Sequence, residues 1–121
     1  MRIYLSGKWE DRARCQFYMK LLRNAGHEIT VDWTDHKYED ENYPKEYCSD
    51  DVKGVREAEA YIGVFIEKEY KYRGALVEFG IALGQGKKCY FIGHAQDSCI
   101  FRHHPLVQTF ESISDIIKEL Q

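Results

Sequence analysis

The chain has 121 residues, of which 44% are hydrophobic and 31% charged, and its formal net charge is −3. This length predicts one domain over residues 1–121, with enough chain to bury a core without disulfide bonds. The acidic balance argues against a nucleic-acid polymer or an anionic membrane as partner, because a negatively charged surface attracts neither.

The cysteines and apolar runs are typical of a cytoplasmic protein. None of the four cysteines forms a C-x-x-C pair or stands at zinc-finger spacing from a histidine. Two adjacent histidines, His103 and His104, cannot easily face one metal ion. The sequence shows no signal-peptide pattern and no apolar run of membrane-spanning length. We therefore expect a reducing compartment, no metal and no other cofactor.

The first half of the chain is predicted to alternate strands and helices. Arg2–Ser6 is short and apolar, which predicts a strand, and residues 11–25 repeat apolar side chains at helical spacing before a terminating glycine. Residues 27–33 alternate and predict a second strand. Residues 34–45 are charged, lack periodicity and include a proline, so we expect a long loop there.

The second half continues this alternation. Ser49 is predicted to cap a short helix, and residues 61–66 form an apolar run typical of a central parallel strand. A polar loop at 67–73 precedes an apolar helix at 74–85, whose glycines four residues apart favour close approach to another backbone. A strand is predicted at residues 88–93, followed by an irregular segment at 95–105. A short strand at 107–110 and an amphipathic helix at 112–120 complete the chain.

This order of elements predicts an α/β fold. Strands that alternate with helices form right-handed crossovers, which place helices on both faces of a parallel sheet. Four or five strands in so short a chain indicate a flavodoxin-like doubly wound sheet. Sites in such sheets lie at the carboxyl ends of the strands, where we expect the loops at residues 6–11, 33–47 and 67–73 to meet.

Glu78 is the most informative residue of the chain. It is the single ionisable side chain between Gly74 and Gly84, and on a helix it falls between Ile81 and Ala82. Burying a carboxylate is costly, so one that is flanked by apolar groups is a candidate functional residue. The other interpretation is a glutamate at the helix rim that turns out to water.

Three further residues are candidate functional residues, and each also has a purely structural interpretation. Asp51 borders the apolar stripe of its predicted helix, but it also suits the first turn of any helix. Tyr4, in the first strand, could hydrogen-bond a carboxylate or lie with its hydroxyl at the rim. Trp9 could stack on a planar base or pack on its own loop.

The first loop has one glycine and matches neither a dinucleotide-binding nor a Walker pattern. Lys8, Arg12 and Arg14 at a helix start could hold one phosphate, although such residues also serve as a solvated helix start.

Four segments together resemble the nucleoside 2-deoxyribosyltransferase family, whose superfamily includes the deoxynucleoside 5′-monophosphate N-glycosidases. They are IYLSGKW at residues 3–9, GHEI at 26–29, Asp51 eight residues before Glu59, and GALVEFG at 74–80. The resemblance runs from residue 2 to about residue 93, and more loosely to residue 105.

The resemblance implies cleavage of an N-glycosidic bond in a nucleoside or nucleoside monophosphate, with a free base as second partner. Glu78 matches the nucleophile that forms a glycosyl-enzyme intermediate, Tyr4 the tyrosine that hydrogen-bonds it, and Asp51 an aspartate at the base or sugar side. The intermediate passes to another base, which gives transfer, or to water. A homo-oligomer is implied, with residues 93–104 completing a neighbouring site. The implied substrate-binding residues are Ser6, Gly7, Lys8, Trp9, Tyr72 and Gly74.

The chain departs from the family pattern at Tyr72, where transferases often carry an aspartate and some monophosphate hydrolases a serine. Glu59 stands where an aspartate is usual, while Trp9 matches a base-side tryptophan of some transferases. Two alternatives to a transferase therefore stay open: a nucleoside 5′-monophosphate N-glycosidase, with a phosphate pocket at Ser6, Lys8 and Arg12, and a non-catalytic nucleotide-binding sensor.

Overall fold

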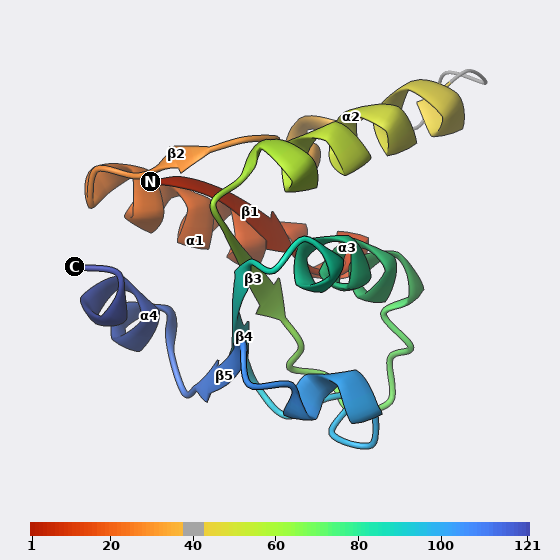
Figure 1. Cartoon of the computed structure of the whole chain (residues 1–121). Coiled ribbons are helices and arrows are strands. Elements are labelled where there is room, and N and C mark those ends of the chain that lie inside the picture. Colours follow the sequence, from red (N-terminus) through yellow and green to blue (C-terminus); the bar gives the residue numbers. More distant parts are fainter. Residues whose placement is uncertain (38–42) are drawn as a thin grey trace.

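A computed structural model describes residues 1–37 and 43–121 of the chain, and these residues contain a five-stranded parallel sheet (Figure 1). The spatial order of the strands is β2-β1-β3-β4-β5, so the chain winds first toward one edge of the sheet and then toward the other. The strands are β1 (Arg2–Ser6), β2 (Glu28–Ile29), β3 (Ala60–Val64), β4 (Lys88–Ile92) and β5 (Val107–Phe110).

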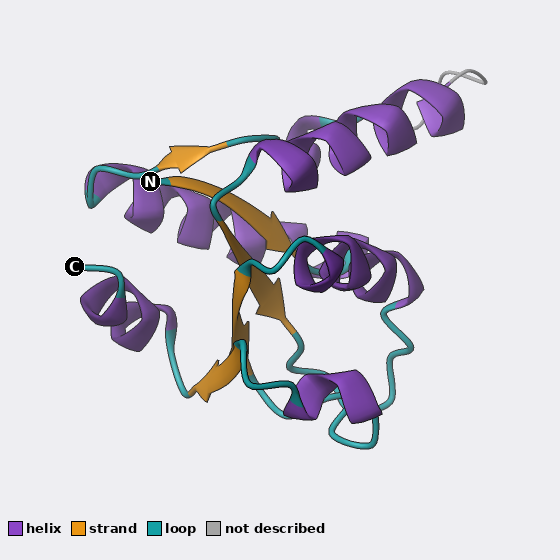
Figure 2. Cartoon of the chain, in the orientation of Figure 1, coloured by secondary structure: helices purple, strands orange, loops and turns teal. Residues whose placement is uncertain are grey.

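Helices cover both faces of this sheet (Figures 1 and 2). The right-handed crossovers place α1 on one face and α2 and α3 together on the other, where they pack against each other. The predicted flavodoxin-like α/β class is therefore confirmed. The α-helices are α1 (Arg12–Asn24), α2 (Tyr43–Glu57), α3 (Arg73–Gly84) and α4 (Ile113–Glu119), and short 3-10 helices lie at Trp9–Asp11, Trp33–Asp35 and Ile100–His103. None of the described helices combines the length and the apolar character needed to cross a membrane.

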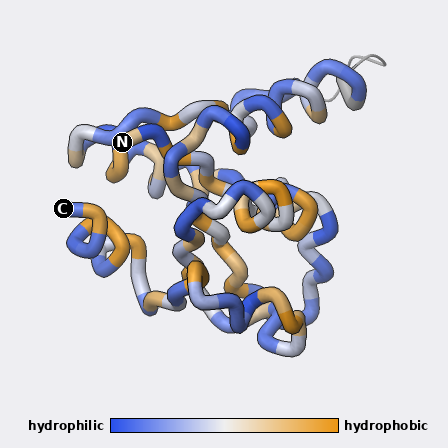
Figure 3. The backbone as a smooth tube through the Cα atoms, in the orientation of Figure 1, coloured by the Kyte–Doolittle hydropathy of each residue, from blue (hydrophilic) through white to orange (hydrophobic). Residues whose placement is uncertain are grey.

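A large part of the core lies where α3 packs on the central strands. All five residues of β3 are buried, as its continuous apolar run predicts. Helix α3 buries Ala75, Phe79 and Ala82, and Figure 3 shows how hydrophobic residues follow this helix. The aromatic rings of Tyr61, Phe79 and Phe91 meet between helix and sheet at centroid distances of 4.8 to 6.3 Å. This packing fixes α3 against the strands that end at the site.

The second predicted strand is shorter than its sequence pattern suggests. Only Glu28–Ile29 pairs with β1, and Trp33 begins a 3-10 helix instead of ending the strand. Two hydrogen bonds explain this turn. The Asp32 side chain accepts from the Thr34 amide, and Nε1 of Trp33 donates to the Leu5 carbonyl at 2.7 Å.

Helix α2 begins earlier than predicted. The predicted start at Ser49 is wrong, because the helix already includes Tyr43 and Pro44. A proline is tolerated in the first turn of a helix, where its missing N–H has no partner to lose. The predicted loop at 34–45 is correspondingly shorter, and its residues 38–42 lie outside the described part of the chain.

Three glycines show how closely α2 and α3 approach the rest of the chain. A Cβ at Gly54 of α2 would lie 2.4 Å from Val31 Cγ2 and 3.2 Å from Tyr4 Cδ2, so α2 approaches β1 closely at that point. At Gly80 and Gly84 a Cβ would meet no described atom within 4 Å other than those of its chain neighbours and its own helix backbone. The close backbone approach predicted for those two glycines is therefore wrong within this chain.

Candidate active site

A small pocket lies at the carboxyl ends of β1 and β3, between α2 and the first turns of α3. Its volume is about 170 Å³. The first two predicted site loops contribute to it, as does the start of α3 after the third. Its lining residues are Tyr4, Gly7, Trp9, Trp33, Asp51, Gly74, Ala75 and Glu78.

Glu78 points into this pocket and is held by both of its oxygens. Tyr4 donates its hydroxyl proton to Oε2 at 2.6 Å, and Ser6 donates to Oε1 at 2.7 Å. Burial raises the pKa of Glu78, while the two hydrogen bonds lower it again in part. The carboxylate is therefore turned inward and oriented from β1, rather than swung out to water.

The aromatic residues behind Glu78 keep this geometry fixed. Tyr4 is fully buried, and burial, with the nearby charge of Glu78, raises the pKa of its phenol well above the usual value, so it remains a proton donor. Tyr61 stacks beside Tyr4 at a centroid distance of 6.5 Å and donates its hydroxyl proton to the Ala75 carbonyl at 3.0 Å. These contacts join β1, β3 and the first turn of α3.

Asp51 supplies a second carboxyl group from α2. Its Oδ1 is buried without a hydrogen-bond partner among the described residues, and His36 Nε2 lies 4.0 Å away. Burial, followed by the charge of Glu78, raises the pKa of Asp51 to about 7. Near neutral pH a large fraction of Asp51 therefore carries a proton. Two carboxyl groups in one pocket, one of them protonated, can act as a nucleophile and a proton donor.

The three cations that could hold a phosphate all have partners within the protein. Lys8 forms an ion pair with Glu67 of the β3–α3 loop and lies 4.8 Å from the centre of the Tyr70 ring. Arg12 lies over Trp9, with its guanidinium carbon 4.5 Å from the ring centre, and donates to the Trp9 carbonyl at 3.2 Å. Arg14 contacts Asp11 at 3.5 Å.

The structure brings together most, but not all, of the residues singled out in the sequence. Ser6 reaches the pocket through Glu78, whereas Lys8 lies next to it in its ion pair. Tyr72 is buried outside the lining, where its hydroxyl accepts from the Glu67 amide at 3.0 Å. It adopts a left-handed conformation with φ of 51°, and it shapes the loop before α3. Trp33 lines the pocket but was not singled out, although it begins one of the three predicted site loops.

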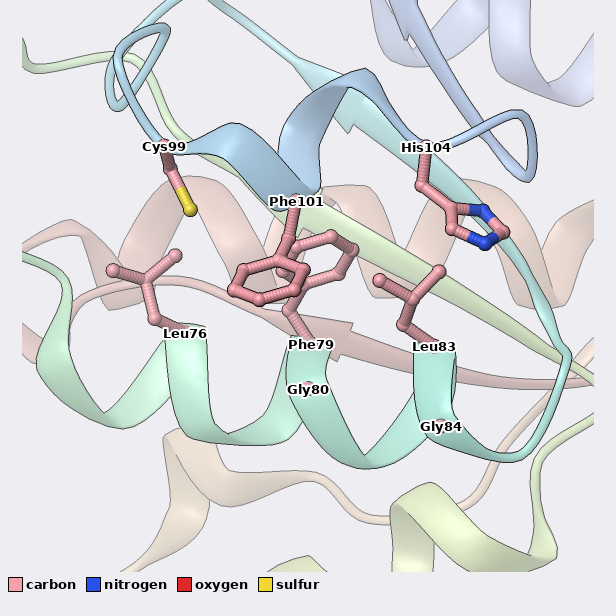
Figure 4. A pocket seen from close by; sticks show the side chains of 8 residues that line it. All are labelled: Leu76, Phe79, Gly80, Leu83, Gly84, Cys99, Phe101 and His104. Atoms are coloured by element: carbon pink, nitrogen blue, oxygen red, sulfur yellow. The ribbon is translucent and has the colours of Figure 1, made fainter.

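A larger groove of about 480 Å³ lies on another side of α3 (Figure 4). Leu76, Phe79 and Leu83 of α3 point toward the facing segment, which carries Cys99, Phe101 and His104. Its lining contains no carboxylate and one histidine, His104, so it lacks the acid and base groups of the smaller pocket. In the described part of the chain, no cluster of three His, Cys, Asp or Glu side chains could hold a metal ion.

Known proteins resemble this chain in structure but not closely in sequence. Comparisons with protein-family models and with curated proteins give no match. The CMP N-glycosidase of Clostridium botulinum superposes with a TM-score of 0.68 and 17% identity, over 99% of this chain and 98% of the glycosidase. The 2-deoxyribosyltransferase of Bacillus psychrosaccharolyticus superposes with a TM-score of 0.70 and 15% identity, over 97% of this chain and 90% of the transferase. The chain therefore has the fold shared by a 2-deoxyribosyltransferase and a CMP N-glycosidase.

Proposed function

We propose that this protein cleaves the N-glycosidic bond of a nucleoside or nucleoside monophosphate, with Glu78 as the nucleophile. The observation that carries the proposal is the pair of hydrogen bonds from Tyr4 and Ser6 to the two oxygens of Glu78, inside a pocket that also contains Asp51. A buried carboxylate that is oriented by two donors and shares its pocket with a second carboxyl group suits glycosidic cleavage by a nucleophile and a proton donor.

The first step is attack of a Glu78 oxygen on the anomeric carbon of the sugar. A bond forms between that carbon and the carboxylate, the bond to the base nitrogen breaks, and the electron pair leaves with the base. Asp51 donates its proton to the departing base, because a neutral base is a better leaving group than its anion. The product of this step is a glycosyl ester on Glu78.

The second step frees the enzyme. Water or the nitrogen of another base attacks the anomeric carbon, and the Glu78 carboxylate departs. Asp51, deprotonated by the first step, accepts the proton of the incoming group and returns to its starting state. Transfer and hydrolysis therefore differ only in which nucleophile reaches the ester.

The environments of the two carboxyl groups support these separate roles. Two hydrogen-bond donors stabilise the carboxylate of Glu78, whereas Oδ1 of Asp51 has none among the described residues. The shared proton is therefore assigned to Asp51, which leaves Glu78 ionised for attack. The likeness to a CMP N-glycosidase and a 2-deoxyribosyltransferase adds support from the fold.

The direct test is an assay for release of free base from purine and pyrimidine 2′-deoxynucleosides and their 5′-monophosphates, with and without an added acceptor base. We expect release of base, and a new nucleoside when transfer outruns hydrolysis. Binding of these compounds without any cleavage would contradict the proposal and favour a nucleotide-binding sensor.

Replacing Tyr4 by phenylalanine tests how Glu78 is held. The Tyr4 hydrogen bond lowers the pKa of Glu78, so its loss should raise that pKa and reduce the ionised fraction. We expect kcat/KM for base release to fall about 10- to 100-fold, in keeping with one lost hydrogen bond to a charged group and some misorientation. The acidic limb of the pH profile should move to higher pH. Tyr18→Phe on α1 is the control; an unmoved acidic limb in Tyr4→Phe would contradict the assigned role.

We propose that the protein forms a homo-oligomer. Ile100 and Phe101 are exposed in the segment at residues 93–104, as is Val77 on α3.

We also propose a cytoplasmic location. All four cysteines are unpaired, in keeping with a reducing compartment.

A further inference from the structure

Lys8 lies in the chain between Gly7 and Trp9, which both line the pocket, and it forms an ion pair with Glu67 of the β3–α3 loop. We propose that the substrate is a nucleoside without a 5′-phosphate, and that Glu67 determines this preference by occupying Lys8. This inference rests on the proposed function, since it names the substrate class of the same site.

The orientation of a bound nucleoside follows from where the two carboxyl groups lie. Asp51 must face the base to protonate it, and Asp51 stands with Trp33 on the β2–α2 side of the pocket. Glu78 faces the anomeric carbon. In this orientation the 5′ end of the sugar would extend away from Asp51, and Gly74 and Ala75 at the start of α3 line the pocket as well. Glu67 belongs to the loop that leads into this helix.

The groups that could bind a phosphate at this end are already engaged. Ser6 is fully buried, and its hydroxyl donates to Glu78. Arg12 lies over Trp9. The Lys8 side chain is 14% exposed, and it is held between the Glu67 carboxylate and the Tyr70 ring. A phosphate would have to displace one of these partners before it could bind Ser6, Lys8 or Arg12.

The charges around Lys8 also disfavour a bound phosphate. The hydrogen bond to Glu67 raises the pKa of Lys8, and the charge of Glu10 adds to this effect, so two carboxylates already surround one ammonium group. A phosphate near −2 would approach these carboxylates and Glu78 together. An uncharged 5′-hydroxyl meets no such repulsion.

Another cation at this end is Arg73, the first residue of α3, which follows a loop that also carries the exposed Lys68 and Lys71. It is exposed, and its side chain makes no ion pair or hydrogen bond with the rest of the described chain. If a phosphate were bound in spite of the Lys8–Glu67 pair, Arg73 beside Gly74 would be the group to hold it. The experiment therefore includes this residue.

The test compares kcat/KM for base release from 2′-deoxyadenosine, 2′-deoxycytidine and their 5′-monophosphates. We expect the wild type to prefer each nucleoside by about tenfold or more, the scale of one charge-assisted contact. Glu67→Gln frees Lys8, so the monophosphate-to-nucleoside ratio of kcat/KM should rise about tenfold. This gain should vanish when Lys8→Met is added, because the gain requires the ammonium group. The matched control is Glu69→Gln, which removes the same charge from the same loop.

Several outcomes would overturn the inference. One is a wild type that prefers the monophosphates, above all if Arg73→Ala abolishes that preference. Another is a gain in Glu67→Gln that equals the gain in Glu69→Gln or persists without Lys8. Cleavage of neither substrate class would instead overturn the proposed function, and the inference with it, whereas cleavage of monophosphates alone would leave the function standing.

Discussion

Replacing Glu78 by glutamine is expected to reduce base release at least about 10⁴-fold, because the amide cannot form the glycosyl ester. The substitution keeps the size of the side chain and an oxygen that accepts from Tyr4 or Ser6. A trapped 2-fluoro sugar on Glu78, detected by mass spectrometry in the wild type and absent from Glu78→Gln, would identify the nucleophile directly. A variant that retains cleavage within about tenfold of the wild type would refute the assignment.

Stability measurements separate this loss from misfolding. Burial raises the pKa of Glu78 above its value in the unfolded chain, so the folded state binds this proton more tightly. The free energy of unfolding of the wild type therefore falls as the pH rises from the pKa of Glu78 in the unfolded chain through its pKa in the folded protein. Glu78→Gln has no such proton to lose, so this decrease is absent from the variant. We expect the variant to melt at or above the wild-type temperature at pH 7. A strongly lowered melting temperature would show that the glutamine had disturbed the pocket.

The sheet and the candidate nucleophile Glu78 were predictable from local patterns in the sequence. The strand β3 is a continuous apolar run, and Glu78 is a lone carboxylate in an apolar helix. The start of α2 lacked such a signal. Its residues 45–50 are almost all exposed, so no apolar period marks them, and Pro44 resembles a helix breaker although a first turn accepts it.

Contacts between distant residues could not be inferred from local pattern. The Lys8–Glu67 pair joins loops 59 residues apart, and the Tyr4–Glu78 hydrogen bond spans 74 residues. The family resemblance suggested the Tyr4 contact, yet nothing in the sequence indicated that Lys8 would be paired. The raised pKa of Asp51 likewise depends on its burial and on Glu78 across the pocket. Such features decide specificity and protonation, and they require the folded geometry.

The pH dependence of cleavage should report the proton on Asp51. Burial and the charge of Glu78 place the pKa of Asp51 at about 7, so the donor form prevails below that pH and is lost above it. We expect kcat/KM for base release to fall as the pH rises through about 7, approaching tenfold per pH unit, while Glu78 remains ionised. Asp51→Asn should lose about 10²- to 10⁴-fold in kcat/KM, and its profile should lack this alkaline fall.

A substrate that needs no proton donor distinguishes this role from a structural one. The base of 7-methyl-2′-deoxyguanosine already carries a positive charge, so it departs as a neutral molecule without help from an acid. Asp51→Asn should therefore cleave this compound far closer to the wild-type rate than it cleaves 2′-deoxyguanosine. An equal loss on both substrates would show that Asp51 acts on binding or on the shape of the pocket. Glu78→Gln should fail on both, because the nucleophile is needed whichever base departs.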